Sequence, residues 1–401
     1  MATTSKKFES VAMLPGNPKW DESIHREGTL YSREDDIRSP FERDNGRILH
    51  CLAYRRLKHK TQVFFSPDND HICTRIEHVN HVASVSRTIA KELGLNEELV
   101  YAIALGHDVG HAPFGHHGEK ILDGLCQPTG RFWHEQHSLR VLDLIEAMPG
   151  PDGKQHALAL TYAVRDGVVT HCGEVHEERI VPREIAVDLY SITGAGSIPS
   201  YSWEGCVVKL ADKIAYLGRD IEDALMLGII EESMLESLVR YACSIGISVE
   251  TISNNALIHH FIIDVCRTSS IAEGIGLSSN YLQLMKRVGE FSKDHIYCHP
   301  RLEWYKKYGN LILQSIYEYL SQQYNGERTL TMLSTRLKRK SLLLGYFIEY
   351  LNQKVGKEEE GHLPLYSLAK EQDYKQACID FIAGMTDGFA ERCFQELVSF
   401  S

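Results

Sequence analysis

Apolar residues recur at helical spacing through most of the chain, and the clearest case runs from Thr74 to Gly94. The apolar residues of this range that share one helical face are Val82, Val85, Ile89 and Leu93. Thr74 and Glu77 have the spacing of a capping box, which satisfies backbone N–H groups of the first turn and predicts that the helix starts there. His78 lies four residues before Val82, so its imidazole is expected to face the core.

Two further helices are predicted to direct polar side chains inward. Asn96 is a good N-cap for the first of them. One face of that helix carries Val100, Ile103 and His107. One face of the second helix carries Val208, Asp212, Tyr216 and Asp220, which repeat every four residues. Because a buried carboxylate is costly without a cation or several donors beside it, we expect such a partner near Asp212.

The same periodicity, found along nearly the whole chain, predicts an all-α protein. Residues 1–45 are polar and charged, and we expect an N-terminal arm that packs on the core or on a neighbouring subunit. Residues 46–225 are expected to form the catalytic core, with Arg47–Leu57 as one helix and Met148–Gly153 as a turn. Residues 226–401 carry several amphipathic helices that are expected to complete the fold and to provide an oligomer interface.

Composition favours a cytoplasmic protein. The chain has 401 residues, of which 43% are hydrophobic, enough to bury a large core as one or two domains. No apolar run is as long as a membrane span, and the first seven residues lack the apolar segment of a secretory signal. The ten cysteines are scattered without zinc-finger spacing, which is typical of reduced thiols.

Four polar positions are predicted to form one metal site. They are His78, His107, Asp108 and Asp212. Neutral imidazole nitrogens and carboxylate oxygens together suit divalent cations such as Zn, Mn, Fe, Co or Mg. A lone inward histidine is more often a hydrogen-bonded core residue, and this alternative applies to His78 taken alone. A shared site explains the set better, because the four residues reach inward from three different helices.

A loop rich in glycine and histidine follows the His107-Asp108 pair. Its glycines, which allow conformations and close approaches that side chains block, are Gly106, Gly110, Gly115 and Gly118. Such freedom suits a segment that folds around a ligand. His111, His116 and Glu119 are therefore candidates for proton transfer or phosphate contact, with His116 and Glu119 at the i, i+3 spacing of a pair. His117 is expected to be structural or to face solvent.

At these residues the chain resembles the HD-domain deoxynucleoside triphosphate triphosphohydrolases, a dGTPase-like family related to the human SAM-and-HD-domain dNTP hydrolase. The resemblance runs from about Arg43 to Asp223, with a weaker echo in Phe381–Asp387. Its most specific parts are Arg55-Arg56-Leu57 with Lys60-Thr61-Gln62-Val63, the loop from His107 to Glu119, and Ala211-Asp212-Lys213-Ile214-Ala215-Tyr216. It implies an all-α HD-domain core and metal-dependent hydrolysis of dNTPs at the α-phosphorus, which yields deoxynucleoside and triphosphate.

The resemblance also implies roles for the matching residues. The metal ligands it implies are His78, His107, Asp108 and Asp212. The catalytic pair beside the α-phosphate is His116 and Glu119, and the further groups on the phosphate side are His111 and His134. The substrate-binding residues are Arg75 and Lys213 for phosphate and Gln62, Tyr216 and Asp220 for the deoxyribose. The chain departs from the family at His81, where a Glu is usual, and at Ala112-Pro113, where Pro-Pro is usual.

The net charge of the chain limits how a triphosphate substrate could bind. The chain has a formal net charge of −11, from 43 basic and 54 acidic residues, so bulk electrostatics oppose a triphosphate. Local cations must therefore attract it, namely the metal ion, Arg75, Lys213 and histidines. The basic run Arg336–Lys340 is most simply a solvated helix face. Within the resembled family, nucleotides and single-stranded DNA act as effectors, so nucleic acid is expected here only in that role, beside a possible dNTP effector and a homo-tetramer or homo-hexamer.

Two other functions remain as alternatives. One is a different HD phosphohydrolase, acting on nucleoside monophosphates or on cyclic or alarmone nucleotides. The combination of Gln62, Tyr216 and Asp220 with the loop histidines argues against it. The other is a non-enzymatic nucleotide sensor, which the complete set of expected metal ligands argues against.

Overall fold

The fold is given by a computed structural model. It describes residues 6–28, 30, 35–64, 69–127, 130–172, 178–336, 341–356 and 364–399. In these ranges seventeen α-helices make up nearly all of the regular structure, and a single two-stranded hairpin is the one sheet. The prediction of an all-α protein is confirmed.

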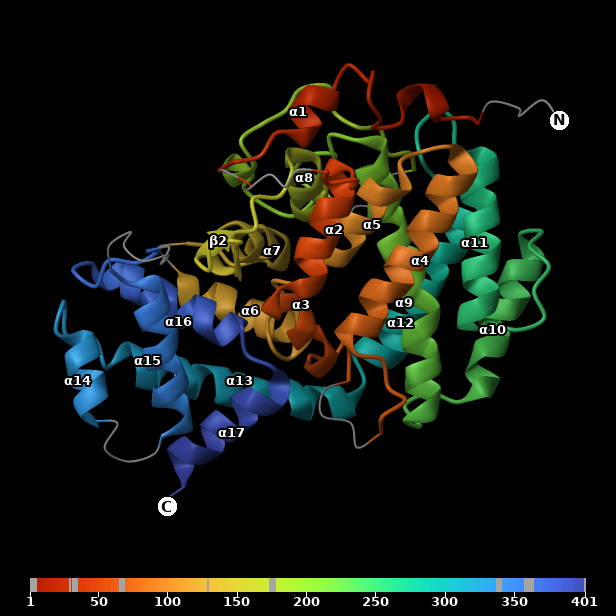
Figure 1. The fold of residues 1–401 in the computed structure, drawn as a ribbon. Coiled ribbons are helices and arrows are strands. Elements are labelled where there is room, and N and C mark those ends of the chain that lie inside the picture. Colours follow the sequence, from red (N-terminus) through yellow and green to blue (C-terminus); the bar gives the residue numbers. More distant parts are fainter. Residues whose placement is uncertain are drawn as a thin grey trace.

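The elements are named as in Figure 1. The helices of the first part of the chain are α1 (Trp20–Ile24), α2 (Pro40–His50), α3 (Leu52–Arg56), α4 (Arg75–Leu93), α5 (Glu97–Gly106), α6 (Gly115–Cys126), α7 (His134–Arg140), α8 (Tyr162–Thr170) and α9 (Trp203–Met226). Those that follow are α10 (Glu232–Ser244), α11 (Asn254–Thr268), α12 (Ser279–Ser292), α13 (Pro300–Ser321), α14 (Thr329–Arg336), α15 (Leu342–Lys354), α16 (Glu371–Ala383) and α17 (Asp387–Val398). The strands β1 (Ala147–Pro149) and β2 (Gln155–Ala157) pair antiparallel.

Helices α4 and α5 begin and end where the sequence predicts. Thr74 is the N-cap of α4 and forms the predicted capping box with Glu77. Gly94 closes the helix in the left-handed conformation, with a φ of 87°, which glycine adopts without a steric penalty. The Asn96 side chain accepts hydrogen bonds from two backbone N–H groups at the start of α5. Local capping chemistry therefore fixes the two helices that lead to His78 and His107.

The central core is built around α4 and α9, which lie side by side with α5 and α11 packed against them (Figure 1). Val79, Val82 and Ile89 of α4 are fully buried there, as are Val208 and Ile214 of α9. Burial of these aliphatic side chains is the main driving force that holds α4 and α9 together. As a result, the helices that carry the predicted metal ligands share one rigid core.

A second hydrophobic cluster joins α6 to the C-terminal helices. Phe114, Ile121 and Leu122 pack in it with apolar residues of α13, α15 and α16. Helices α10, α11 and α12, by contrast, share the core of α4 and α9. The division at residue 225 stays a prediction, but the hydrophobic clusters do not follow it.

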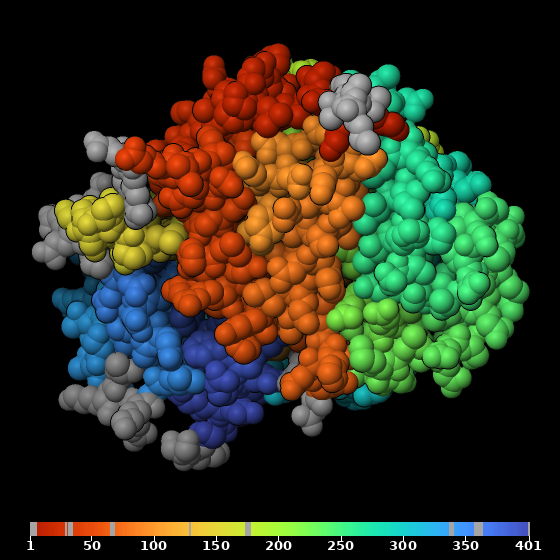
Figure 2. Space-filling model, turned by 45° about the vertical axis from the view of Figure 1, so that its right-hand side comes forward, coloured from red at the N-terminus to blue at the C-terminus, as the bar shows by residue number. Residues whose placement is uncertain are grey.

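The N-terminal segment packs on its own chain. Phe8 is fully buried, and its ring lies edge-on to Trp203 at 5.1 Å between centroids. The Glu204 carboxylate accepts hydrogen bonds from the backbone N–H of Met13 at 2.8 Å and of Asn96 at 3.0 Å. Figure 2 shows this red segment lying across one end of α4 and α5. Of the two positions expected for the arm, residues 8–13 therefore occupy the one on the core.

One local expectation was wrong. Arg47–Leu57 is not one helix, because Cys51 is extended between α2 and α3, and its Sγ accepts a hydrogen bond from the N–H of Tyr54. The expected turn within Met148–Gly153 is present, and it connects the strands β1 and β2 of the hairpin.

Two further sequence expectations concern the basic run and the membrane. Residues 337–340 of the basic run lie outside the described residues. Among the helices that the structure does describe, none has the length and apolar character that a membrane crossing needs.

Candidate functional site

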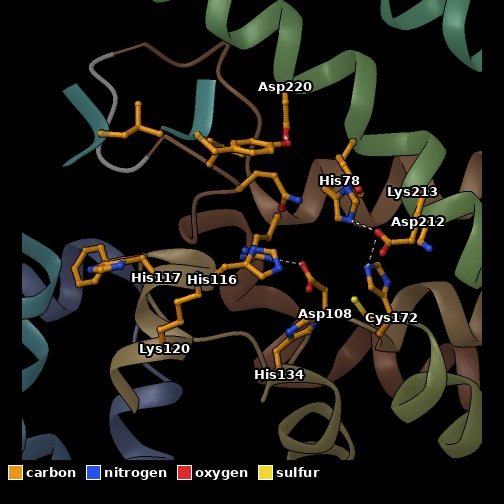
Figure 3. A pocket seen from close by; sticks show the side chains of 18 of the residues that line it. His78, Asp108, His116, His117, Lys120, His134, Cys172, Asp212, Lys213 and Asp220 are labelled. Carbon is orange, nitrogen blue, oxygen red and sulfur yellow. Dashed lines mark hydrogen bonds and ion pairs between the residues drawn. The ribbon is translucent and has the colours of Figure 1, made fainter. Parts of the chain in front are cut away.

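A cavity of about 440 Å³ opens between α4, α6, α9 and α13 (Figure 3). The predicted site residues that line it are Gln62, Arg75, His78, His107, Asp108, His116, His134, Asp212, Lys213, Tyr216 and Asp220. Figure 3 shows His78, Asp212 and Lys213 on one side, His117 and Lys120 on the opposite side, and His116 between them. The fold thus brings the three sequence motifs to one place.

The four predicted metal ligands converge at one end of this cavity. One nitrogen or oxygen atom from each of His78, His107 and Asp108 lies within 4.8 Å of the others. The Oδ1 atom of Asp212 lies 2.9 Å from Nε2 of His78 and 3.9 Å from Nε2 of His107. Two helices and the end of a third supply these groups. His78 lies on α4, Asp212 lies on α9, and the His107-Asp108 pair directly follows α5.

The protonation pattern of this group fits a divalent cation. His107 donates from Nδ1 to the carbonyl of Ala104 at 2.7 Å, which leaves the Nε2 lone pair directed at the other ligands. That buried Nε2 atom has no hydrogen-bond partner in the described part of the chain. Burial would raise the pKa of Asp212, but the hydrogen bond with His78 and the nearby imidazoles outweigh it and hold that pKa below its usual range. An ionised carboxylate beside a buried lone pair is the donor set of a metal site.

Arg75 lies beside the metal ligands with one edge of its guanidinium group occupied. Its Nη1 atom is 2.6 Å from Oδ2 of Asp108, and the side chain is only 1% exposed. The Nε and Nη2 atoms are buried and have no hydrogen-bond partner among the described residues. Because unsatisfied buried donors are costly, an anion in the cavity would stabilise this arrangement.

A second polar group lies next to the first and contains the four predicted catalytic residues. A ligand atom from each of His111, His116, Glu119 and His134 lies within 4.8 Å of the others. Glu119 Oε2 is 2.8 Å from Nδ1 of His134 and 3.9 Å from Nε2 of His111. The hydrogen bond of Glu119 is therefore made with His134, whereas the sequence suggested His116 as its partner.

Electrostatics divide this second group into an ion pair and a neutral imidazole. Burial would lower the pKa of His134, but the carboxylates of Glu135 and Glu119 raise it well above its usual value. Burial would raise the pKa of Glu119, but its hydrogen bond with His134 keeps it below its usual value. The His116 ring is exposed to the cavity, yet the groups packed around it, the charge on His134 and that on Arg75 lower its pKa to about 4. At neutral pH, His116 is therefore an uncharged imidazole beside an ion pair.

The residues expected to hold the sugar lie along the wall of the cavity. Gln62, Tyr216 and Asp220 all line it, and Asp220 accepts a hydrogen bond from the Tyr297 hydroxyl at 2.6 Å. Burial raises the pKa of Asp220 to about 7, although the Tyr297 hydroxyl opposes this shift. Tyr297 ends the helical turn Lys293–Tyr297, which comes shortly before α13 in the sequence. The sequence did not predict its role, because no local pattern links it to α9.

His171 is a second residue that the sequence analysis missed. Its ring is buried 4.8 Å from that of His107, and burial with the neighbouring His107 lowers its pKa to about 3. Its Nδ1 atom bonds the carbonyl of Val168 at 2.6 Å, three residues earlier, just as His107 bonds Ala104. A histidine directly after a buried helix is thus a signal, shared with His107, that could have found His171.

Two further histidines line or adjoin the site. His117 is half-buried and lines the cavity, and its Nε2 is bonded to the carbonyl of Lys306 at 2.7 Å, which agrees with the structural role that was one of its two expected roles. His81 has a buried Nδ1 atom without a hydrogen-bond partner in the described residues. Burial and the charge of Arg219 lower its pKa, so this position, usually Glu in the resembled family, adds no negative charge near the metal ligands.

Comparisons with known proteins agree with the geometry. Residues 75–217 match the model of the HD domain. A deoxyguanosinetriphosphate triphosphohydrolase-like protein of Caldanaerobacter subterraneus subsp. tengcongensis is 45% identical over 50% of this chain and 51% of its own length. The chain thus matches only about half the length of this relative.

Proteins with the same description from Desulfatibacillum aliphaticivorans and Clostridium perfringens match far more of the chain. The first is 33% identical over 90% of this chain and 88% of its own length, and the second is 31% identical over 98% and 96%. The chain therefore belongs to the deoxyguanosinetriphosphate triphosphohydrolase-like family of HD-domain proteins.

Proposed function

We propose that this protein is a metal-dependent hydrolase of deoxynucleoside triphosphates that releases deoxynucleoside and inorganic triphosphate. The observation that carries this proposal is the position of Arg75. Its guanidinium group is anchored by the metal-ligand residue Asp108 and lines the same cavity as His116. A phosphate bound there would meet the metal ligands and the proton-transfer group together. The descriptions of the relatives point to the same reaction for those proteins.

Binding has to overcome the formal net charge of −11. A divalent ion held by His78, His107, Asp108 and Asp212 would polarise a phosphoryl oxygen and lower the pKa of a water molecule. The unpartnered edge of Arg75 offers a planar pair of donors to phosphate oxygens, and Lys213 adds a compact positive charge to the lining. Local cations therefore replace the bulk attraction that the chain lacks.

In the proposed reaction the water oxygen bonds to the α-phosphorus while the bond from that phosphorus to O5′ breaks. The triphosphate keeps the water oxygen, and a water proton ends on the 5′-hydroxyl of the deoxynucleoside. His116 is uncharged and lines the cavity, so it is suited to carry that proton. The ion pair of Glu119 and His134 holds the position of the neighbouring rings.

Discrimination against ribonucleotides is part of the proposal. Tyr216 and Asp220 lie one helical turn apart on α9, on the face that also carries Asp212. A tyrosine ring against C2′ leaves no room for a 2′-hydroxyl, and a buried hydroxyl without a partner destabilises the complex.

We also propose that the protein acts in the cytoplasm as a homo-tetramer or homo-hexamer. Trp304 and Leu311, seven residues apart on α13, are 72% and 53% exposed, which supports contact between copies along this helix. Regulation by a second dNTP would require a coupling between such an interface and the cavity. Nucleic acid would act only as an effector.

A product assay tests the proposed function. The protein is incubated with each dNTP and rNTP plus Mg or Mn, singly and in mixtures, and the products are separated by anion-exchange chromatography. Triphosphate together with deoxynucleoside is the expected result. Monophosphate or pyrophosphate would instead indicate another HD phosphohydrolase, and the absence of any product would indicate a nucleotide sensor. Metal analysis of the purified protein would identify the ion among Mg, Mn, Fe, Co and Zn.

A further inference from the structure

Asp387, the first residue of α17, joins two segments of the cavity that are far away in the sequence. Its side chain is buried, and its Oδ2 atom accepts hydrogen bonds from the backbone N–H of Thr61 at 3.0 Å and from the Thr61 hydroxyl at 2.7 Å. Its Oδ1 atom accepts a hydrogen bond from the backbone N–H of Phe114 at 3.0 Å. Each carboxylate oxygen therefore holds a different segment.

Each of these segments leads directly to a proposed functional residue. Thr61 precedes Gln62, which lines the cavity, and Phe114 precedes the turn of α6 that carries His116. The two segments also touch each other, since a Cβ atom built on Gly115 would lie 3.2 Å from the carbonyl oxygen of Gln62. A displacement of either segment would therefore change the positions of both Gln62 and His116.

The backbone at Phe114 needs a restraint of this kind. Phe114 has a φ of 63°, in the left-handed region, and only two other non-glycine residues of the described chain, Asp35 and Ala159, have a positive φ. A bulky residue occupies this region only when its surroundings hold it there. The hydrogen bond from its N–H to Asp387 is one such restraint, and it sets the direction in which α6 starts.

A buried lysine strengthens the same connection. Lys60 is 2% exposed, and its Nζ atom donates to the carbonyl of His111 and, at 2.7 Å, to that of Ala383. The backbone carbonyl of Lys60 accepts from the N–H of Arg75 at 2.9 Å, at the start of α4. Lys60 thus links the segment of residues 383–387 to His111, and Asp387 links the same segment to Phe114, three residues further along the loop from His107 to Glu119.

We propose that Asp387 is a positioning residue, which holds Gln62 and His116 in the relative geometry that the reaction needs. It does not touch the substrate. It acts through Thr61 and Phe114. Its loss should therefore lower kcat and leave the metal content unchanged. This inference rests on the proposed function, because His116 is assigned its role there.

The test compares Asp387→Asn with a matched control. Asparagine has one acceptor oxygen in place of two, so it can hold Thr61 or Phe114 but not both in the same way. The control is Asp264→Asn, because Asp264 accepts from the backbone N–H of Ser278 at 2.7 Å and from its hydroxyl at 2.8 Å, in the same pattern but between α11 and α12. Thr61→Val is a milder second variant that removes only the hydroxyl donor.

For Asp387→Asn we expect a decrease in kcat of about 10- to 100-fold, the range for groups that orient reacting ones, with unchanged metal content. Thr61→Val should lower kcat in the same direction by less, and Asp264→Asn should keep the wild-type kcat. Hydrogen exchange of the peptide covering residues 110–119 should become faster in Asp387→Asn but not in Asp264→Asn.

Several outcomes would overturn the inference. A wild-type kcat in Asp387→Asn would do so, as would equal losses in Asp387→Asn and Asp264→Asn, which would indicate a general effect on folding. If Asp387→Asn does not fold, a wild-type kcat in Thr61→Val would have the same meaning. If the wild-type protein hydrolyses no dNTP, the proposed function fails, and the exchange measurement then decides whether Asp387 holds the loop.

Discussion

Asp212 of α9 and His78 of α4 meet at 2.9 Å between Oδ1 and Nε2, so the contact between these two helices is also the centre of the proposed metal site. Neither helix alone carries enough ligands to hold an ion. The packing of α4 against α9, which is driven by apolar side chains, therefore creates the polar site.

Replacement of Asp212 with Ala should abolish turnover and remove most of the bound metal. The reason is that the remaining ligands lose the carboxylate that α9 contributes. The helical core should remain, because the apolar contacts between α4 and α9 do not involve this side chain. Metal content by mass spectrometry and helicity by circular dichroism would check this. Full metal occupancy in the variant would show that Asp212 is not a ligand.

Replacement of His116 with Ala should leave the metal bound, unlike Asp212→Ala, and should lower kcat by about two to four orders of magnitude. His116 lies in the second polar group, with its ring 4.9 Å from that of His111, and not among the metal ligands. Single-turnover kinetics at saturating dNTP would measure the loss. A kcat within a few-fold of wild type would exclude proton transfer by His116.

Deoxynucleotides should be hydrolysed far faster than ribonucleotides, because Tyr216 and Asp220 line the wall where the sugar is expected. Replacement of Tyr216 with Ala should reduce the difference between dGTP and GTP by opening space at C2′. The measurement is kcat/KM for both nucleotides in both proteins. Comparable values for dGTP and GTP in the wild-type protein would contradict the proposed sugar site.

Acid should destabilise the protein through Asp380 of α16. This carboxylate is fully buried and receives hydrogen bonds from Arg140 at 2.8 Å and from Tyr366 at 2.6 Å. Burial would raise the pKa of Asp380, but His137 and Arg140 outweigh it and hold the pKa well below its usual value. The stabilisation is therefore complete above the unfolded pKa of about 3.9 and is lost as the pH falls below it.

Replacement of Arg140 with Met should lower the free energy of unfolding at pH 7 by about 3–5 kcal/mol, because Asp380 is left as a buried charge with less compensation. The deficit should shrink at acid pH, where Asp380 becomes protonated. Urea unfolding at several pH values would measure both effects. As a control, Arg240→Met breaks an exposed pair with Glu236 and should change the free energy of unfolding little. An equal effect of the two substitutions would show that the Asp380 network does not stabilise the fold.

A homo-oligomer that responds to nucleotides should show activity on one dNTP that rises when another is present. A coupling free energy of about 1–3 kcal/mol corresponds to an activation of roughly 5- to 150-fold. Light scattering gives the oligomer, and Trp304→Glu on the exposed face of α13 should shift it towards the monomer. A monomeric wild-type protein with hyperbolic kinetics in every nucleotide mixture would exclude this regulation.

The sequence was sufficient for the parts of the site that local chemistry determines. The capping box at Thr74 fixed the start of α4, and the four-residue repeat along α9 placed Asp212, Tyr216 and Asp220 on one face. These patterns depend only on neighbours within a helical turn or two, so they can be seen without the fold.

The remaining parts depend on contacts between distant segments. Tyr297 reaches Asp220 because the helical turn Lys293–Tyr297 packs against α9, and Asp387 reaches Phe114 because the start of α17 lies beside the residues that lead into α6. No spacing in the sequence encodes either contact. The sequence did not predict the end of α2 at Cys51, for a related reason. The N–H of Leu52 donates to Glu146 at 2.8 Å, a tertiary contact that overrides helix propensity.

The contact between Asp387 and Phe114 also has a consequence for the order of events during synthesis. The loop that carries His116 leaves the ribosome first, and its partner carboxylate follows 273 residues later. Translation at about 5–20 residues per second separates the two by roughly 14–55 seconds. A nascent chain can therefore assemble α4, α5 and α9 before its loop acquires the restraint from α17. Newly made protein would pass through a stage that holds metal but turns over little substrate.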